Sequence, residues 1–210
     1  IAELADRRAD AEGAAQARRE AAERLGVNPD VPTLLVTGGS LGALHVNESM
    51  TGAADALPEG VQVVHLTGRG KDEPVRRAVE AAGLADRWHV IDYLTTMEDA
   101  LAVADLVVCR SGAGTVAEME ALGLPCIYVP LPIGNGEQRL NAADHVAAGG
   151  AQLVDDKDFT ADFVRRNVFP LLGSTRLADM AAASQSLGRA GAARALADLA
   201  LEQVKEVGHE

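Results

Sequence analysis

The sequence predicts an α/β protein in which about six parallel strands form one doubly wound sheet. Short apolar runs alternate with longer helical stretches, as they do where crossover helices join parallel strands. Glycines follow several of these runs directly, where such a fold turns from strand to helix. Hydrophobic residues make up 48% of the chain and aromatic residues only 3%. The core must therefore be aliphatic, which suits helices packed on a parallel sheet.

The expected strands are apolar runs of about four to six residues that end in Gly, Pro or polar residues. They are residues 33–37, 61–66, 88–91, 106–109, 126–129 and 151–154. Because the strands of such a sheet all point the same way, their strand-to-helix turns gather at one edge, and we expect this edge to bind the ligand.

Several of the expected helices carry end signals. Gly26 and Gly123 each stop a helix, Pro74 lies near a helix start, and Thr95 with Glu98 fits a capping box. The expected helices are residues 1–25, a stretch from the turn at residue 42 to about 57, residues 74–82, a short helix after residue 96, residues 115–122 and 137–148, and residues 160–201 with breaks near Gly173 and Gly188.

The chain divides into a lead-in segment, one ligand-binding domain and a tail. Residues 1–30 are expected to be an exposed lead-in helix and a linker, residues 31–202 the α/β domain, and residues 203–210 a frayed tail. The length of 210 residues suffices for one such domain and is too short for two. The chain begins with Ile1 instead of Met, which favours a fragment of a longer protein.

Charge and cysteine content exclude several classes of protein. With 19 basic and 31 acidic residues the formal net charge is −12, which repels phosphate backbones and argues against a nucleic-acid partner. A phosphorylated ligand stays compatible, because backbone N–H groups at a helix start bind phosphate without Lys or Arg. The two cysteines lie inside apolar runs and are expected to be buried thiols. No apolar stretch is long enough for a membrane span, and no signal peptide is evident.

The turn after the first strand, Gly38-Gly39-Ser40-Leu41-Gly42, occupies the place of a phosphate-binding loop. Glycine permits positive φ and lets a ligand approach the backbone, although a plain tight turn explains the segment equally well. The second strand does not end in the acidic residue that nicotinamide-dependent enzymes need, and no Tyr-x-x-x-Lys follows. With no Gly-Lys-Ser/Thr either, an oxidoreductase is disfavoured and a P-loop NTPase is excluded.

The turn after the fourth strand, residues 110–115, is the sharper signal. Its small residues leave open N–H groups at a helix start, where the macrodipole favours a diphosphate. Glu118 lies on the same helix face as Gly114, roughly 6 Å further along the axis. That offset suits a carboxylate that accepts both ribose hydroxyls while the helix start holds the phosphates. Taken alone, Glu118 would be a solvated helix charge.

The turn after the fifth strand, residues 134–138, opens a helix that carries two carboxamides. The spacing of Gln138 and Asn141 lets both converge above the sheet edge. Amide side chains donate and accept hydrogen bonds, as recognition of sugar hydroxyls requires. For Asn135 and Glu137, helix capping is the alternative role.

Together these three turns resemble the lipid I N-acetylglucosaminyltransferase (MurG) family. The family pattern appears in residues 36–43 (VTGGSLGA) with Asn47, in residues 108–118 (VCRSGAGTVAE), and in residues 129–142. The match runs from about residue 33 to 199, and the second block is the most specific. The resemblance implies a Rossmann-like half of a GT-B fold, with residues 31–202 as its UDP-sugar-binding domain.

The resemblance also implies roles for individual residues. Tyr93 would pack against the uracil, the backbone of Leu94 would read the edge of the base, and Glu118 would hold the ribose. The helix start would hold the phosphates, and the third turn would face the N-acetylglucosamine. The expected substrate-binding residues are Gly39, Ser40, Gly42, Asn47, Tyr93, Leu94, Arg110, Ser111, Gly112, Ala113, Gly114, Thr115, Glu118, Glu137, Gln138 and Asn141.

Two departures from the family pattern matter. Many members have two consecutive glutamines where this chain has Glu137 and Gln138, which leaves the role of Glu137 in sugar selection open. Members also have an amino-terminal domain that binds the lipid acceptor and supplies the base. The 210 residues contain no counterpart, so no catalytic residue is expected in this chain.

The implied activity is that of a hexosyltransferase that needs no cofactor. It would bind UDP-N-acetylglucosamine for inverting transfer to the muramoyl sugar of lipid I in peptidoglycan synthesis, as a cytoplasmic protein peripheral on the inner face of the cell membrane. The alternative is a non-catalytic UDP-sugar-binding subunit of a two-chain glycosyltransferase. A UDP-sugar 2-epimerase would share the architecture, but no suitable set of carboxylates and His is evident.

No metal site is expected. The Asp155-Asp156-Lys157-Asp158 segment contains an Asp-x-Asp, which holds a metal in GT-A enzymes. Here it lies between a short strand and a helix, where helix capping and turn formation are the favoured roles. The five histidines show no ligand spacing and are interpreted as structural.

Overall fold

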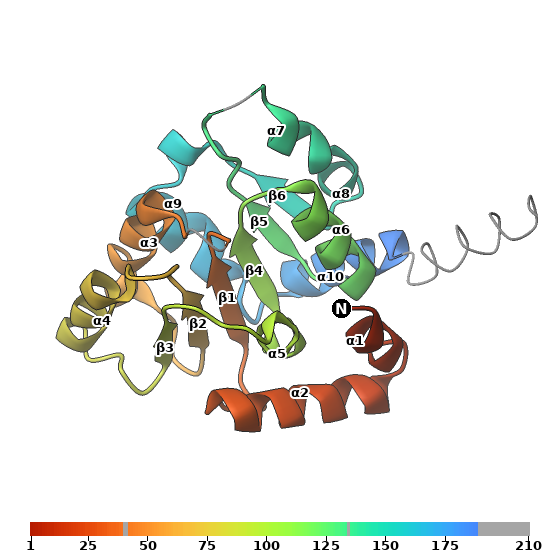
Figure 1. Ribbon diagram of the computed structural model, residues 1–210, viewed down its shortest axis with the longest axis horizontal. Helices are drawn as coiled ribbons and strands as arrows, with labels where there is room; N and C mark the ends of the chain where they lie inside the picture. The colour runs from red at the N-terminus through yellow and green to blue at the C-terminus, as the bar shows by residue number, and fades with distance from the viewer. Residues whose placement is uncertain (40–41, 134, 189–210) are drawn as a thin grey trace, which may run out of the picture.

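The computed structural model describes residues 1–39, 42–133 and 135–188. Its six strands are all parallel and form one sheet in the order β3-β2-β1-β4-β5-β6 (Figure 1). The expected doubly wound α/β fold is confirmed. The strands are β1 (Thr33–Thr37), β2 (Gln62–Leu66), β3 (Trp88–Ile91), β4 (Leu106–Cys109), β5 (Cys126–Tyr128) and β6 (Ala151–Leu153).

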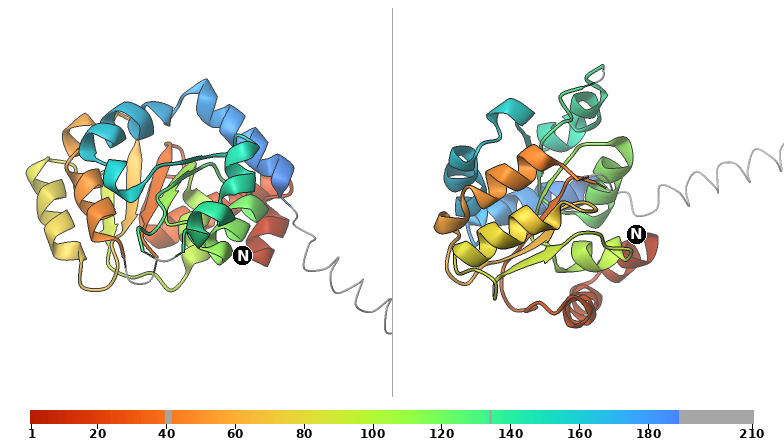
Figure 2. Two further views of the ribbon diagram at one scale, coloured as in Figure 1. Left: turned by 90° about the horizontal axis from the view of Figure 1, so that it is seen from above. Right: turned by 60° about the vertical axis from the view of Figure 1, so that its left-hand side comes forward.

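Helices cover both faces of the sheet (Figure 2). On one face Leu34 and Val36 pack under α3, α4, α9 and α10, and on the other Leu35 packs under α1, α2, α5, α6 and α8. Because helices cover both faces, β1, β2, β4 and β5 are buried along their whole length. The helices are α1 (Ala2–Arg7), α2 (Ala11–Leu25), α3 (Leu44–Thr51), α4 (Asp72–Ala81), α5 (Met97–Val103), α6 (Ala113–Leu122), α7 (Glu137–Asn141), α8 (Ala143–Ala147), α9 (Ala161–Phe163) and α10 (Thr175–Leu187).

The lead-in segment differs from its prediction as one exposed helix. It forms two helices, because the Asp10 side chain accepts a hydrogen bond from the Gly13 backbone at 2.8 Å and so starts α2 anew. The second helix also buries Ala17, Ala21 and Ala22 in the core under the sheet. Residues 1–25 are therefore packed on the domain.

Two other predicted helices are broken. The 137–148 stretch divides at Ala142 into α7 and α8. After residue 160 the chain forms α9, a π-helical turn (Val164–Val168), a 3-10 turn (Phe169–Leu171) and α10. The predicted break at Gly173 is confirmed, and its φ is +79°. Residues 189–210, with the predicted end of the helix and the tail, lie outside the described residues.

Helix ends were predicted with mixed success. Gly26 and Gly123 stop their helices in the left-handed conformation, as expected. The capping box at Thr95 is wrong, because α5 begins at Met97 and no side chain caps it. A carboxylate of its first turn, Asp99, instead accepts hydrogen bonds from Arg24 of α2 at 2.6 and 3.0 Å.

Candidate functional site

The carboxyl ends of the strands meet at one edge of the sheet, and the order of the strands reverses there between β1 and β4. β1 pairs with β2 on one side and with β4 on the other. The helices that follow β1 and β4 accordingly pack on opposite faces. Such a switch point leaves a crevice between the two turns, which is where open α/β sheets bind ligands.

The start of α6 offers an open site for an anion. The first N–H groups of a helix have no intrahelical partners. Because no side chain caps α6 and its first turn holds no acidic residue, these groups are left open to a ligand. A side chain added at Gly112 or Gly114 would meet nothing within 4 Å, so a ligand can approach the backbone. The Ser111 hydroxyl is buried and has no hydrogen-bond partner among the described residues. Free amides, helix dipole and hydroxyl together favour a phosphate.

Glu118 lies one helical turn beyond Gly114 and is half-buried. Two of its neighbours on α6, Val116 and Met119, are buried in the core, so packing fixes the rotation of the helix about its axis. The i, i+4 spacing keeps Glu118 on the same face as Gly114. The carboxylate can accept two hydrogen bonds from adjacent hydroxyls.

The turn after β1 is tightly closed. Gly39 and Gly42 have φ values of +80° and +67°, and the Gly42 N–H donates to the Gly39 carbonyl at 2.9 Å. Ser40 lies outside the described residues. The turn thus presents backbone at the crevice, as a phosphate-binding loop requires.

Asn47 lies behind this turn. Its side chain is 3% exposed, its amide nitrogen donates to the Thr67 carbonyl at 3.1 Å, and its amide oxygen lies 3.0 Å from the ring Nε2 of His65. Both ends of the amide therefore have partners within the protein. This arrangement differs from the substrate-facing role that the family resemblance implies.

Tyr93 follows β3 at the same edge and is 39% exposed. The guanidinium carbon of Arg69, from the turn after β2, lies 3.9 Å from the centroid of the Tyr93 ring. This is a cation–π contact that holds one face of the ring. The neighbouring Leu94 packs partly against the core. Sequence reasoning did not single out Arg69, although its position between Gly68 and Gly70 in a strand-to-helix turn was a usable cue.

The third turn connects to the start of α6. The Gln138 side-chain oxygen accepts hydrogen bonds from the backbone N–H groups of Leu131 and Ser111 at 2.9 and 3.3 Å. The Asn141 amide nitrogen donates to the Ser111 carbonyl at 3.1 Å. The two carboxamides converge, as their spacing indicates. Because the oxygen of Gln138 is occupied, its amide nitrogen is the end that can serve a ligand, as a donor.

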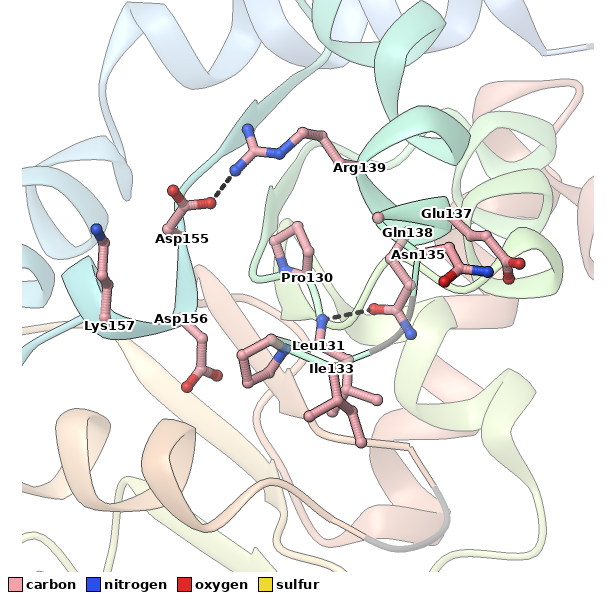
Figure 3. Close-up of a pocket in the computed structure, with 12 residues that line it drawn as sticks. Pro130, Leu131, Ile133, Asn135, Glu137, Gln138, Arg139, Asp155, Asp156 and Lys157 are labelled. Carbon is pink, nitrogen blue, oxygen red and sulfur yellow. Dashed lines mark hydrogen bonds and ion pairs between the residues drawn. The ribbon is translucent and has the colours of Figure 1, made fainter.

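A cavity of about 470 Å³ opens beside this turn. Figure 3 shows its walls, formed by the loop after β5, the first turn of α7 and the segment after β6. Arg139 forms an ion pair with Asp155 across the opening, and Glu137 lies on the far side of α7 from that pair. The size of the cavity suits a sugar ring beside the anion site.

Arg110 and Asp156 join the loop after β5 to the segment after β6. The Arg110 guanidinium donates to the carbonyls of Val129 and Pro130 at 3.0 and 3.1 Å and forms an ion pair with Asp156. The turn expected for residues 155–158 is confirmed, because Asp156–Asp158 form a 3-10 turn, but the expected capping role is wrong, since no side chain of the segment caps a helix there. The carboxylates of Asp155 and Asp156 are instead held by the two arginines.

The buried histidines are structural. Burial lowers the pKa of His65 to about 3 and that of His145 to about 4, so both are neutral. In the part of the chain that the structure describes, no three His, Cys, Asp or Glu side chains are grouped so as to hold a metal. None of the helices in those same segments is both long and apolar enough for a membrane crossing.

The fold is that of the carboxyl-terminal domain of GT-B glycosyltransferases. The chain belongs to the glycosyltransferase family 28 C-terminal domain family, whose model matches residues 33–196. This confirms the resemblance to the MurG family that the three turns indicated.

Two curated relatives carry the name UDP-N-acetylglucosamine–N-acetylmuramyl-(pentapeptide) pyrophosphoryl-undecaprenol N-acetylglucosamine transferase. The protein of Bifidobacterium longum (strain NCC 2705) is 47% identical over 197 residues, which cover 87% of this chain and 50% of the relative. That of Streptomyces coelicolor is 44% identical over 192 residues, which cover 90% of this chain and 52% of the relative. The chain thus spans about half the length of these relatives.

Solved structures agree on the fold. The crystal structure of MurG from Acinetobacter baumannii matches with a TM-score of 0.72 at 28% identity, over 87% of this chain and 52% of that one. WaaG, a glycosyltransferase involved in lipopolysaccharide biosynthesis, shares the fold alone, with a TM-score of 0.63 at 18% identity over 82% of this chain and 46% of its own.

Proposed function

We propose that this chain is the donor-binding half of a hexosyltransferase that uses UDP-N-acetylglucosamine. The observation that carries the proposal is the open start of α6 at the switch point, with Glu118 one turn along the same helix. In a nucleoside diphosphate, the distance between the charged diphosphate and the paired ribose hydroxyls matches the distance between the start of α6 and Glu118. The names of the relatives supply the particular sugar.

The proposed donor lies across the switch point. Its diphosphate accepts hydrogen bonds from the N–H groups of residues 112–115 and from the Ser111 hydroxyl. The Glu118 carboxylate accepts hydrogen bonds from the two ribose hydroxyls. Tyr93 and the backbone of Leu94 bound the uracil, with Arg69 behind the ring. The sugar extends toward Gln138, which donates through its free amide nitrogen, with Glu137 and Asn141 close by. Gly39 and Gly42 face the diphosphate and sugar from the other side.

The proposed reaction is an inverting displacement. The acceptor hydroxyl attacks C1 of N-acetylglucosamine in line, the bond from C1 to the diphosphate oxygen breaks, and UDP leaves. The start of α6 stabilises the negative charge that develops on the leaving diphosphate. The acceptor is the C4 hydroxyl of the muramoyl sugar of lipid I at the cytoplasmic membrane face. An amino-terminal domain binds this acceptor and supplies the base that takes its proton.

Glu118→Ala tests the site directly. Loss of a charge-assisted contact to the ribose is expected to weaken binding of UDP-N-acetylglucosamine by about 1.5–3 kcal/mol, or roughly tenfold to a hundredfold. Isothermal titration calorimetry of the chain with UDP-N-acetylglucosamine, UDP-glucose and NAD measures this loss and the selectivity together.

Glu80→Ala is the matched control, because it removes the same charge from an exposed position of a helix at the other side of the sheet. Its affinity for the donor is expected to be unchanged. Binding of NAD, or full affinity in Glu118→Ala, contradicts the site assignment.

Two alternatives have separate tests. If the chain is the non-catalytic subunit of a two-chain transferase, an acceptor-binding protein should co-purify with it. An epimerase would change the configuration at C2 of the free nucleotide sugar, which NMR of the incubated donor detects. A putative UDP-N-acetylglucosamine 2-epimerase from Listeria monocytogenes has the same fold, with a TM-score of 0.63 at 21% identity.

A further inference from the structure

A buried chain of hydrogen bonds runs from the edge strand β3 along one face of the sheet to the turn after β1. The Trp88 indole N–H donates to Nδ1 of His65 at 3.3 Å, and Nε2 of His65 lies 3.0 Å from the Asn47 amide oxygen. The Asn47 amide nitrogen then donates to the Thr67 carbonyl at 3.1 Å. All four residues are at most 3% exposed. We call this set the Trp88–Thr67 relay.

The direction of every bond in the relay is fixed. An indole nitrogen can only donate, so Nδ1 of His65 must accept and Nε2 must carry the ring proton. Asn47 therefore has to present its oxygen to His65 and its nitrogen to the Thr67 carbonyl. Burial keeps His65 neutral, with its pKa lowered to about 3, so Nδ1 stays unprotonated and can accept from Trp88.

The relay ends against the turn after β1. A Cβ atom added at Gly42 would lie 2.1 Å from the Thr67 carbonyl oxygen and 2.9 Å from Cα of Gly68. The backbone of Gly42 therefore rests directly on the carbonyl that Asn47 holds. Gly42 in turn donates to the Gly39 carbonyl and closes the turn.

We propose that Asn47 is a positioning residue of the donor site and does not touch the donor. Together with His65 it fixes the position of the Thr67 carbonyl, and this carbonyl fixes the position of the turn at Gly39 and Gly42. This inference rests on the proposed function, because the turn is taken to face the donor. It replaces a direct contact of Asn47 with the ligand by an indirect one.

The two roles predict different couplings between residues. If Asn47 acts through the Thr67 carbonyl, then displacing the turn by another route makes Asn47 irrelevant to binding. Gly42→Ala provides that route, since its methyl group would clash with the same carbonyl. If Asn47 touches the donor, the effects of the two substitutions should add.

The experiment is a double-mutant cycle on donor binding. UDP-N-acetylglucosamine is titrated into the wild-type chain, Asn47→Asp, Gly42→Ala and the double variant. The aspartate keeps the size of Asn47 and can still accept from His65, but it cannot donate to Thr67. Each single variant is expected to bind about tenfold more weakly, and the double variant no more weakly than the worse of the two.

Ser49→Ala is the matched control. Ser49 is buried on the same helix, and its hydroxyl donates to the Phe159 carbonyl at 2.7 Å, away from the turn. Its loss is expected to lower stability and leave affinity unchanged. A double variant weakened by about a hundredfold, the product of the two single effects, overturns the proposal. So does an unchanged affinity in Asn47→Asp.

A second readout needs no donor. Amide hydrogen exchange at Gly42, measured by NMR in the free chain, is expected to accelerate in Asn47→Asp and in His65→Gln and to stay unchanged in Ser49→Ala. Exchange at Gly42 that stays slow in the two relay variants overturns the inference, and His65→Gln decides if Asn47→Asp does not fold. A wild-type chain that fails to bind the donor refutes the proposed function instead, and the exchange result still tests the relay.

Discussion

At the residue scale, the site depends on the absence of side chains at Gly112 and Gly114. Nothing in the described protein occupies the space in front of either residue, so the uncapped helix start faces solvent.

Gly114→Ala should separate stability from binding. Alanine in a helix is expected to stabilise the chain by about 0.4–1 kcal/mol, while its methyl group fills the approach to the backbone and weakens donor binding by about tenfold or more. Thermal unfolding and calorimetry measure the two effects, and unchanged affinity would show that the donor does not approach Gly114.

Single residues were predicted from sequence to the extent that their neighbours along the chain define them. The open amides of residues 112–115 and the position of Glu118 follow from helix geometry alone. The contact of Arg69 with Tyr93, the pairing of Arg110 with Asp156 and the burial of the Ser111 hydroxyl join residues from different turns. No local pattern encodes those distances.

At the element scale, a second buried network ties β5 to α8 and α10. Nδ1 of His145 lies 2.9 Å from the Tyr128 hydroxyl, and Nε2 lies 2.7 Å from the Ser184 hydroxyl. Because the Ser184 hydroxyl donates a hydrogen bond to the Gly150 carbonyl, its oxygen accepts from Nε2, and the neutral ring can accept from Tyr128 at Nδ1. Burial lowers the pKa of His145 to about 4.

This network predicts how stability depends on pH. The unfolded chain binds a proton at His145 near pH 6.5 and the folded chain only near pH 4. The contribution of His145 to the free energy of unfolding is therefore complete above pH 6.5 and is lost as the pH falls toward 4. The free energy of unfolding changes by up to about 1.4 kcal/mol per pH unit because of this residue. Urea unfolding between pH 7 and 4 measures the slope, which His145→Gln should reduce. An equal slope in the variant would contradict the buried, neutral state.

Strands were predicted better than helices for a physical reason. Every residue of β1 and β2 is buried, so their apolar runs stand out in the sequence. The breaks at residues 8–10 and at Ala142 depend on local caps and on packing against the sheet. Hydrophobic periodicity does not reveal them.

At the scale of the whole molecule, the sheet order brings together turns that are distant in the sequence. The order β3-β2-β1-β4-β5-β6 places the turns after β1 and β4 side by side. The sequence motifs indicated a shared edge, but the order of the strands decides which turns adjoin.

The chain spans about half the length of its relatives (50% and 52%). We predict that the isolated chain binds the donor but transfers the sugar poorly. Transfer at the rate of a complete relative would contradict the expectation that this chain supplies no catalytic base.

We expect above all that the open start of α6 holds the diphosphate of the donor. A crystal structure of the chain soaked with UDP tests it most directly. We predict that the phosphates accept hydrogen bonds from the backbone of residues 112–115, with both ribose hydroxyls on Glu118. A nucleotide bound elsewhere, with the start of α6 left empty, would contradict this account.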